Sequence, residues 1–394
     1  MKNKVLYISY TGMMEPLGTS QVLNYLYGLS KRYTFHLVSL EREKDYLDTS
    51  KKEKLKESLL QQNIHWYPLL YKGGMKGYLS DFLKVYRLTR SLMKKEDIVL
   101  LHCRSYMPTF IAYLLKKGHH NLKYIFDTRG FWFDEKADVG SLNRRNCLYK
   151  IAKWIERKMY LQADQITILS NYGKETILKN LLFRNGDQLN NITVIPTCVD
   201  LEKFNTDRVR QNKKGLIIGY VGTAVGWYNF GKTAEALALI NKQIDCNLLV
   251  FNDGQHYSIK QELAKYGITN YSLEKVSFND MPERMKEIDI SLFFIHPFFS
   301  KRASSATKLG ELFATGIPVI TNAYVGDSEY YINQYSVGKI VDVDNLDNYN
   351  FTQIISELNT GECKNRCRQV AEKYFSLSDG INKYEEIYFH LLNQ

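Results

Sequence analysis

Short apolar runs recur along the chain and alternate with amphipathic stretches. In the first half, runs rich in Val, Ile, Leu and Tyr have the length and polar flanks of buried strands: 4–10, 34–40, 63–69, 97–103, 122–128, 165–170 and 192–196. Between them the apolar positions follow a helical period, as in 20–31, 78–94 and 143–162. This alternation predicts an α/β fold with a parallel, doubly wound sheet.

The same pattern then starts again in the second half of the chain. A second set of strands is predicted at 215–222, 246–253, 271–278, 289–295, 318–322 and 338–343. We therefore predict two Rossmann-like domains, 1–197 and 198–374, with the join inside 193–215, where charged and polar residues replace the periodicity. A terminal helix, 375–394, follows, and the sequence leaves its packing partner open. Sheets of this kind bind ligands beyond the carboxyl ends of their strands, so chemistry is expected just after strands.

Composition and charge narrow the function classes. The chain has 394 residues, of which 44% are hydrophobic, enough for two globular cores. A net charge of +11 favours nucleotides, polyanions or an anionic membrane surface as partners. No helix-turn-helix, zinc-finger or RNA-binding motif is present, which disfavours nucleic acid. With no apolar run of eighteen residues and six scattered cysteines, we expect a cytoplasmic protein, either free or at the inner face of the plasma membrane.

Two loops of the first domain carry candidate chemistry. After the first strand, Gly12 and Gly18 flank a loop, and Thr19 or Ser20 is predicted to cap the following helix. A helix N-terminus offers free N–H groups to an anion, although an ordinary capped turn explains this stretch equally well.

After the fifth strand, "FDTRGFWFDEKADVG" (126–140) mixes carboxylates with large aromatics, which suits a sugar or lipid acceptor. Asp127, at the strand end, is a candidate base or charge stabiliser beside Arg129. Trp132 and Glu135 are candidate acceptor contacts. Arg104, which ends the fourth strand, would pair with a phosphate or with Asp127. The alternative is a solvated charged loop.

In the second domain, "GYVGTAVGWYNFGK" (219–232) follows a strand, and Gly222 would let the backbone approach a diphosphate, with Lys232 adding charge. An ordinary glycine turn is the competing interpretation. The stretch "SSATKLGELFATGIPVITN" (304–322) predicts a helix capped by Ser304 or Ser305 and stopped by Gly316 and Pro318.

Charged groups cluster at the start of that helix. Lys301 and Arg302 precede it, Thr307 and Lys308 open it, and Glu311 follows one turn later. The basic groups would bind a diphosphate, and the carboxylate would accept hydrogen bonds from ribose hydroxyls. The alternative is a surface Lys308–Glu311 ion pair along the helix.

Taken together, these pieces resemble the GT-B glycosyltransferases, specifically the retaining family 4 type. "VIPTCVDLEKF" (194–204) is similar to the interdomain motif of that family, and 304–322 and 163–177 match two further motifs in order and spacing. The resemblance implies two Rossmann-like domains facing each other across a cleft, with an acceptor-side first domain and a nucleotide-sugar second domain. It implies transfer, with retained anomeric configuration, from a nucleotide-diphosphate sugar to a saccharide or lipid-linked saccharide. Bacterial surface or capsular polysaccharide synthesis is the expected setting, with no metal and no other cofactor.

By position, the resemblance implies that Glu311 binds the ribose of the donor and that the Thr307–Lys308 turn binds its diphosphate. The Gly18–Thr19 loop would reach toward the donor phosphates and the acceptor. The chain departs from the family at three places. A sugar-reading carboxylate is replaced by Ala303, and a histidine after the fifth strand by Asp127 and Arg129. The usual Arg and Lys after the glycine of the second domain fall at Thr223 and Tyr228, so that Arg302, Lys301 or Lys232 would substitute for them.

Two other functions remain open at this point: another GT-B activity such as a sugar-nucleotide epimerase, or a catalytically weak nucleotide-sugar binding protein. Peripheral membrane contact is a further option, since 144–164 and 71–90 are basic stretches and the first is an amphipathic helix.

Overall fold

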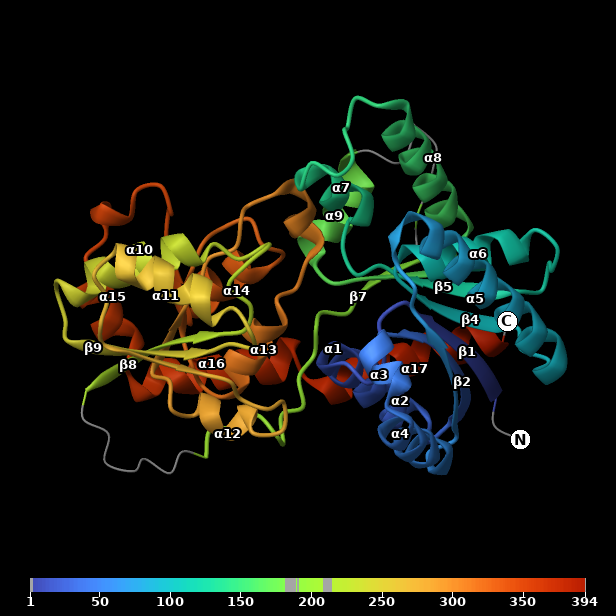
Figure 1. Cartoon of the computed structure of the whole chain (residues 1–394), viewed down its shortest axis with the longest axis horizontal. Helices are drawn as coiled ribbons and strands as arrows, with labels where there is room; N and C mark the ends of the chain where they lie inside the picture. Colours follow the sequence, from blue (N-terminus) through green and yellow to red (C-terminus); the bar gives the residue numbers. More distant parts are fainter. Residues whose placement is uncertain (1–2, 181–188, 190, 208–214, 394) are drawn as a thin grey trace. The chain divides into compact units, whose positions relative to one another are not determined.

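The computed structural model describes residues 3–180, 189, 191–207 and 215–393. Contacts divide the chain into two compact units, Met1–Pro196 with Leu377–Gln394, and Thr197–Ser376. Of the segment in which we predicted the join, residues 208–214 lie outside the described part. Each unit contains a parallel sheet with helices packed against it (Figure 1).

The first unit is built on a seven-stranded sheet in the order β3-β2-β1-β4-β5-β6-β7, with every neighbouring pair parallel. This confirms the predicted α/β fold, and each predicted strand is present. Its strands are β1 (Asn3–Ser9), β2 (Tyr33–Glu41), β3 (Ile64–Leu70), β4 (Leu100–Arg104), β5 (Lys123–Asp127), β6 (Gln165–Ile168) and β7 (Ile192–Val194).

The helices of this unit fill the connections between the strands, as right-handed crossovers in a parallel sheet require. They are α1 (Pro16–Gly18), α2 (Asn24–Leu29), α3 (Glu43–Leu47), α4 (Thr49–Gln61), α5 (Gly74–Glu96), α6 (Tyr106–Lys116), α7 (Trp132–Asp138), α8 (Cys147–Gln162) and α9 (Asn171–Asn180). A single π-helical turn, Thr19–Leu23, joins α1 to α2.

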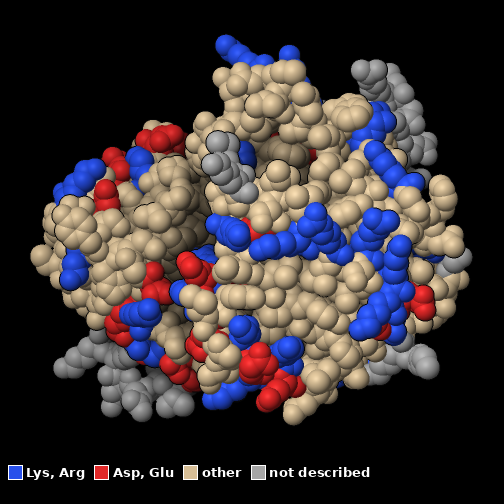
Figure 2. Space-filling model, turned by 45° about the vertical axis from the view of Figure 1, so that its right-hand side comes forward, with Lys and Arg blue, Asp and Glu red and all other residues tan. Residues whose placement is uncertain are grey.

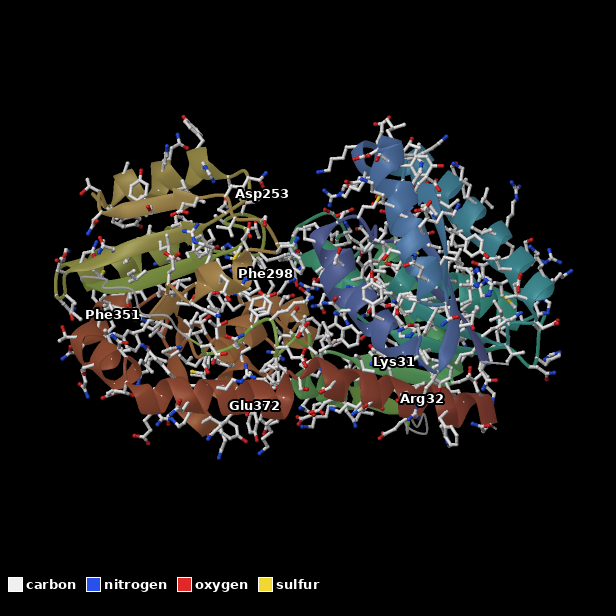
Figure 3. All side chains as sticks on the ribbon, turned by 90° about the horizontal axis from the view of Figure 1, so that it is seen from below. Lys31, Arg32, Asp253, Phe298, Phe351 and Glu372 are labelled. Carbon is white, nitrogen blue, oxygen red and sulfur yellow. The ribbon has the colours of Figure 1, made fainter. Side chains whose placement is uncertain are left out.

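The last helix, α17 (Leu377–Asn393), returns to the first unit and packs beside α2 (Figure 1). Its buried aromatic residues pack on the sheet, and the rings of Tyr388 and Tyr33 meet edge to face with their centroids 5.2 Å apart. Arg32, labelled in Figure 3, forms an ion pair of 2.6 Å with Glu385 of the helix. The chain end is thus part of the core of the first unit.

The second unit has a six-stranded parallel sheet in the order β10-β9-β8-β11-β12-β13. All six predicted strands are present: β8 (Leu216–Val221), β9 (Cys246–Phe251), β10 (Tyr271–Glu274), β11 (Ile290–Leu292), β12 (Val319–Thr321) and β13 (Gly338–Ile340). Its helices are α10 (Phe230–Asn241), α11 (His256–Lys265), α12 (Met281–Met285), α13 (Thr307–Ala314), α14 (Ser328–Tyr335), α15 (Phe351–Leu358) and α16 (Gly361–Tyr374), with 3-10 turns at Phe299–Ala303 and Leu346–Asn348.

Each sheet has one point at which the strand order reverses. In the first unit this point lies between β1 and β4, and in the second between β8 and β11. At such a point the loops leave in opposite directions and open a crevice beyond the strand ends, where ligands of open α/β sheets bind. The fold therefore selects the loops after these strands as the places to look for a site.

Candidate functional site

The loop after β1 leads into a helix that begins earlier than the sequence predicted. The first helical residue is Pro16, with Glu15 at the N-cap position, so the predicted cap at Thr19 or Ser20 is wrong. Proline is favoured at a first helical position because its missing N–H has no partner there, and this moves the start upstream. The Thr19 hydroxyl instead donates to the carbonyl groups of Met13 and Glu15, at 3.3 Å each.

The two glycines of this loop allow a close backbone approach. A Cβ atom on Gly18 would lie 1.9 Å from the carbonyl oxygen of Gly12, which no side chain would permit. The buried carboxylate of Glu41 holds the loop by accepting hydrogen bonds from the backbone of Met13, at 2.9 Å, and Met14, at 3.2 Å. The loop is therefore fixed from both sides.

A buried charge cluster lies at the carboxyl ends of β4 and β5. Asp127 is 2% exposed and accepts a hydrogen bond from the Thr167 hydroxyl at 3.0 Å. Its carboxylate oxygens lie 3.6 Å from a guanidinium nitrogen of Arg129 and 3.6 Å from Nε2 of His102. The two predicted catalytic residues, Asp127 and Arg129, are thus in contact, and they are not part of a solvated loop.

The charges of this cluster determine its protonation. Burial alone would raise the pKa of Asp127, but Arg129, His102 and Arg104 outweigh it and hold that pKa far below its usual range. Burial lowers the pKa of His102, although the carboxylate opposes the shift. At neutral pH the cluster therefore contains an ionised Asp127 and cationic Arg129 around a largely neutral imidazole.

The cluster extends to elements that the sequence did not connect with it. Nδ1 of His102 lies 2.5 Å from the hydroxyl of Tyr388 on α17. Arg129 donates to the side-chain oxygen of Gln21 in the π-helical turn, at 3.4 Å. Arg104 is the strand neighbour of Asp127 in the register of β4 and β5, and it is buried.

Sequence reasoning missed His102, Thr167 and Tyr388 as members of the cluster. A signal existed for His102, because residues 102 and 104 of one strand point to the same face of the sheet. No pattern in the sequence connects Tyr388 to the cluster, since it is 286 positions from His102.

The two predicted acceptor contacts after β5 lie on α7. Trp132 is its first residue and packs against Tyr106, with ring centroids 6.1 Å apart, and against Phe133 at 5.1 Å. Glu135 lies one turn later, and its carboxylate lies 3.4 Å from the position that a Cβ of Gly130 would take. This stretch is a short helix with an aromatic face and is not an open loop.

In the second unit, α13 begins at Thr307, with Ala306 at the N-cap position and no side-chain cap. The predicted caps, Ser304 and Ser305, are therefore wrong. The hydroxyl of Ser305 instead accepts a hydrogen bond from the backbone of Thr197 at 3.2 Å, and its carbonyl accepts one from the Thr197 hydroxyl at 3.0 Å. Ser305 therefore fastens the helix start to the beginning of the unit.

Lys308, one residue into α13, is 6% exposed and lies at the reversal point of the sheet. Its amine is 3.8 Å from the ring centroid of Tyr228, 4.7 Å from that of Tyr220 and 4.8 Å from that of Phe293. Among the described residues it has no hydrogen-bond partner. A Cβ on Gly222, which has a φ of 99°, would be 3.6 Å from this amine.

Glu311 lies one turn after Lys308 on the same helix and is partly exposed. Burial lowers the pKa of Lys308 to about 7, and Glu311 only partly offsets this. Burial also raises the pKa of Glu311 to about 7, against the opposing charge of Lys308. The interpretation of this pair as a surface ion pair is wrong, because Lys308 is buried.

The other predicted donor residues lie around this position in different ways. Lys301 is buried, with its amine 3.5 Å from the ring centroid of Trp227, whereas Arg302 is partly exposed over Phe299. Thr223 is exposed directly after Gly222, and its hydroxyl donates to Gln255 at 3.3 Å.

Lys232, in contrast, forms an ion pair of 3.1 Å with Glu235 of its own helix, α10. None of the contacts of the described residues joins Lys232 to Lys308. Lys308 is therefore the amine that the second unit places beside the glycine of its first loop.

The described residues contain neither a metal-binding cluster nor a membrane-spanning helix. In the ranges that the structure describes, no group of three or more His, Cys, Asp or Glu side chains is arranged to hold a metal ion. No helix in these ranges is both long enough and apolar enough to cross a bilayer.

Comparison with known proteins identifies the class. The family model described as Glycosyltransferase Family 4 matches residues 19–203. This part of the chain is a glycosyltransferase family 4 domain, and the family implies glycosyltransferase activity. No curated protein sequence matches the chain significantly.

Solved structures extend the fold comparison to the whole chain. A glycosyltransferase from Rickettsia africae is similar with a TM-score of 0.71 and 18% identity, covering 99% of both chains. Sucrose-phosphate synthase from Thermosynechococcus elongatus has a TM-score of 0.72 and 14% identity over 100% of both. HepE from Anabaena, in complex with UDP and glucose, has a TM-score of 0.68 and 14% identity, covering 98% of this chain and 100% of that one. The two parallel α/β sheets are those of the GT-B fold.

Proposed function

We propose that this protein is a metal-independent, retaining glycosyltransferase. It would move a hexosyl or related group from a nucleotide-diphosphate sugar to a saccharide or lipid-linked saccharide. The family 4 domain and the similarity to HepE, whose structure holds UDP and glucose, support a nucleotide-sugar donor. Synthesis of a bacterial surface or capsular polysaccharide is the proposed setting.

The observation that carries the proposal is the buried, unpartnered amine of Lys308. Keeping a lysine amine away from water and without a hydrogen bond costs several kcal/mol of folding free energy, unless a ligand supplies the missing partner. The adjacent Gly222 leaves room for the backbone to approach a bulky anion. A diphosphate fits this position because it would supply both a counter-charge and hydrogen-bond acceptors.

The loop after β8 lacks two basic residues that the family resemblance leads us to expect. The expected Arg and Lys are replaced by Thr223 and Tyr228, and the amine of Lys308 lies over the Tyr228 ring. In our proposal, the basic residues just before α13, Lys301 and Arg302, therefore substitute for the missing pair, and the Lys301 amine lies over Trp227 of the same loop.

Glu311 is the proposed ribose ligand. A carboxylate can accept hydrogen bonds from both ribose hydroxyls, and each such bond to a charged acceptor contributes about 1.5–3 kcal/mol. Burial and, as a smaller cause, the charge of Glu311 raise the pKa of Tyr228 to about 12. This electrostatic effect indicates that Glu311 faces the same loop.

In the proposed reaction, the bond between the sugar C1 and the phosphate oxygen breaks, and the acceptor hydroxyl oxygen bonds to C1 on the same face. The proton of this hydroxyl passes to the leaving phosphate oxygen. Lys308 and the neighbouring basic side chains would stabilise the charge that develops on the diphosphate, so that no metal is needed.

The first unit would supply the acceptor side. We propose Asp127 and Arg129 as catalytic residues, with the Gly18–Thr19 loop close to the reacting groups. Arg104, Trp132 and Glu135 are the proposed acceptor contacts. The support is geometric: the Asp127 cluster lies at the carboxyl ends of β4 and β5, where this fold places its chemistry.

A donor panel tests the function. Wild-type protein is incubated with UDP-, GDP- and other activated sugars in EDTA, with and without candidate saccharide acceptors, and nucleotide release is measured. We expect acceptor-dependent release from one donor. Glu311→Ala should weaken donor binding at least roughly 10- to 100-fold, as loss of one charged hydrogen bond predicts.

The matched control is Glu283→Ala, an exposed carboxylate in the second unit, which should leave donor affinity unchanged. Conversion of the donor without an acceptor would favour an epimerase, and binding without turnover would favour a nucleotide-sugar binding protein. A strict requirement for a divalent cation would exclude the metal-independent mechanism.

A further inference from the structure

An apolar cavity opens between four helices of the first unit. It measures about 520 Å³ and lies between α5, α6, α7 and α8. Aromatic and aliphatic side chains line it, among them Phe82, Tyr106, Phe110, Trp132 and Ile155. A cavity with this lining suits a hydrocarbon group better than a sugar, which needs polar partners.

The rim of the cavity exposes large apolar side chains to solvent. Leu79 of α5 is 64% exposed, and Leu148 and Ile151 of α8 are 68% and 48% exposed. Trp154, further along α8 and outside the cavity lining, is 58% exposed. Isolated exposed apolar residues are common, but a group that surrounds an apolar cavity marks an interaction site.

Helix α8 is nevertheless held firmly in place from its inner side. Lys153 forms ion pairs with Asp134 of α7, at 2.8 Å, and with Glu156. Glu156 is fully buried and accepts a hydrogen bond from Tyr106 at 2.7 Å. Because these polar contacts fix the orientation of the helix, the outward direction of Leu148 and Ile151 is a property of the fold.

The charges of the two rim helices are almost all positive at the surface. Helix α5 has two carboxylates. Asp81 is buried and accepts hydrogen bonds from the backbone of Lys72 and Gly73. Glu96, its last residue, is partly buried and forms an ion pair of 2.9 Å with Lys4. In α8 the single carboxylate is the buried Glu156. The charged side chains left toward solvent are basic, such as Lys84, Arg87, Arg90, Lys94, Lys150 and Lys158.

Figure 2, with the first unit turned forward, shows Lys and Arg side chains gathered in a band across it. Anionic head groups attract such residues by about 1 kcal/mol for each Lys or Arg near the membrane surface. An apolar face flanked by basic side chains is the pattern of a surface that lies on a membrane, with its apolar residues in the head-group boundary. A protein partner would require no such excess of one charge.

We propose that the surface formed by α5, α7 and α8 docks on an anionic lipid bilayer, and that its cavity receives one hydrocarbon chain of a lipid. The basic side chains would contact lipid phosphates while Leu79, Leu148, Ile151 and Trp154 enter the boundary. The inference deepens the proposed function, because it would bring the enzyme to a lipid-linked acceptor. It can nevertheless be tested without any turnover.

Vesicle co-sedimentation is the first test. The full chain is mixed with phosphatidylcholine vesicles, with or without phosphatidylglycerol, at physiological salt. We expect at least about tenfold tighter binding to the anionic vesicles, and a loss of that preference at high salt. Failure to bind anionic vesicles, or equal binding to both kinds, would overturn the proposal.

The charge contribution is tested with Arg87→Glu/Arg90→Glu. This variant should lower binding to anionic vesicles at least about tenfold. Its matched control is Lys54→Glu/Lys56→Glu, which makes the same change of charge on the exposed side of α4. An equal loss in the control would show that net charge alone causes the binding, and would contradict a defined surface.

The apolar contribution is tested with Leu148→Ser/Ile151→Ser. Its control, Leu47→Ser/Leu60→Ser, replaces two exposed apolar residues elsewhere in the same unit. We expect about tenfold weaker vesicle binding only for the first variant. If detergent-free size measurements showed that this variant lost self-association instead, the surface would be a protein interface and the proposal would be wrong.

Quenching of tryptophan fluorescence tests the cavity itself. Lipids brominated on their acyl chains should quench the wild-type protein, the Trp227→Phe control and Trp154→Phe, in which Trp132 still lines the cavity. They should lose most of this effect with Trp132→Phe/Trp154→Phe. Loss of quenching already in Trp154→Phe would mean that no chain reaches the cavity. Binding of a nucleotide sugar, measured on the Leu148→Ser/Ile151→Ser variant, should remain unchanged, so failure of the donor site and failure of the lipid surface give different results.

Discussion

Both units bury charged groups near the carboxyl ends of their strands, but the two units differ in the hydrogen-bond and ionic partners that these groups have. In the first unit, the carboxylate of Asp127 has Thr167, Arg129 and His102 as partners within 3.6 Å. In the second unit, the amine of Lys308 is buried to a similar degree, lies against aromatic rings and has no hydrogen-bond partner among the described residues. One cluster is internally compensated, whereas the other is not.

This difference separates groups that are held in place from groups that await a ligand. A buried charge with partners keeps its charged form, as the low pKa of Asp127 shows. A buried amine without a hydrogen-bond partner holds its proton less tightly, as the fall of the Lys308 pKa to about 7 shows. Burial of Lys308 therefore destabilises the folded unit, and binding of an anionic ligand would offset this loss of stability.

The largest effect is expected from breaking the compensated cluster. Asp127→Ala leaves Arg129 and Arg104 buried without their carboxylate, and should destabilise the first unit by about 3–5 kcal/mol. Calorimetric unfolding would measure this change. Thr167→Val, which removes one neutral hydrogen bond to the same carboxylate, should cost only about 1 kcal/mol. Similar losses in the two variants would contradict the ionic account of the cluster.

The opposite result is expected in the second unit. Lys308→Met replaces an unpartnered amine by an apolar side chain of similar length, and should stabilise the unit by roughly 2–4 kcal/mol at pH 7. Nucleotide binding should fall at least about tenfold, because a charged hydrogen-bond donor to phosphate is lost. The exposed Lys260→Met provides the control, with no change in either quantity.

The gain in stability should depend on pH with a defined sign. The pKa of Lys308 falls from 10.5 to about 7 on folding, so between these values the unfolded chain holds a proton that the folded one does not. Wild-type stability therefore rises with pH over this window, and the advantage of Lys308→Met is largest below pH 7 and disappears near pH 10.5. An advantage that did not vary with pH would refute the assignment of this pKa.

Binding of a diphosphate should be accompanied by uptake of a proton at Lys308. At pH 8 the amine of Lys308 is mostly neutral, and a diphosphate would raise its pKa, so binding should take up a proton. Glu311, with a pKa of about 7, is already mostly ionised and contributes little. From pH 7 to 8 the protonated fraction of Lys308 falls roughly fivefold while the ionised fraction of Glu311 roughly doubles, so nucleotide affinity should fall about threefold.

Calorimetry in buffers of different ionisation enthalpy measures this uptake. It should persist in Glu311→Gln and be absent in Lys308→Met. Proton release, or uptake that survives in Lys308→Met, would mean that another group binds the phosphates.

The smallest effect is expected at the edge of the compensated cluster. Tyr388→Phe removes the hydroxyl at 2.5 Å from Nδ1 of His102, and should destabilise the first unit by about 1–2 kcal/mol. Thermal unfolding would detect the change, and Tyr257→Phe, whose hydroxyl lies on the surface of the second unit, should have almost none. No difference between the two would show that the hydroxyl does not hold the imidazole.

Much of the fold could be predicted from local pattern. The thirteen strands of the two sheets follow apolar runs in the sequence, because a strand of a parallel sheet is buried on both faces and must be apolar along its length. The helix starts were predicted less well. Pro16 moved one start upstream, and Ser305 was used by Thr197 instead of capping α13. Both depend on competition for hydrogen bonds that local sequence does not show.

Short-range periodicity and residue type are enough to predict the two sheets, the positions at which their strands end and the charged residues that lie there. Which of these charges have compensating partners depends on contacts between segments that are distant in the sequence. Residues as distant as His102 and Tyr388 meet through the return of α17 to the first unit. The state of Lys308 depends on its exclusion from water by rings from three other segments, because desolvation is a property of the packed interior and of no single stretch of chain.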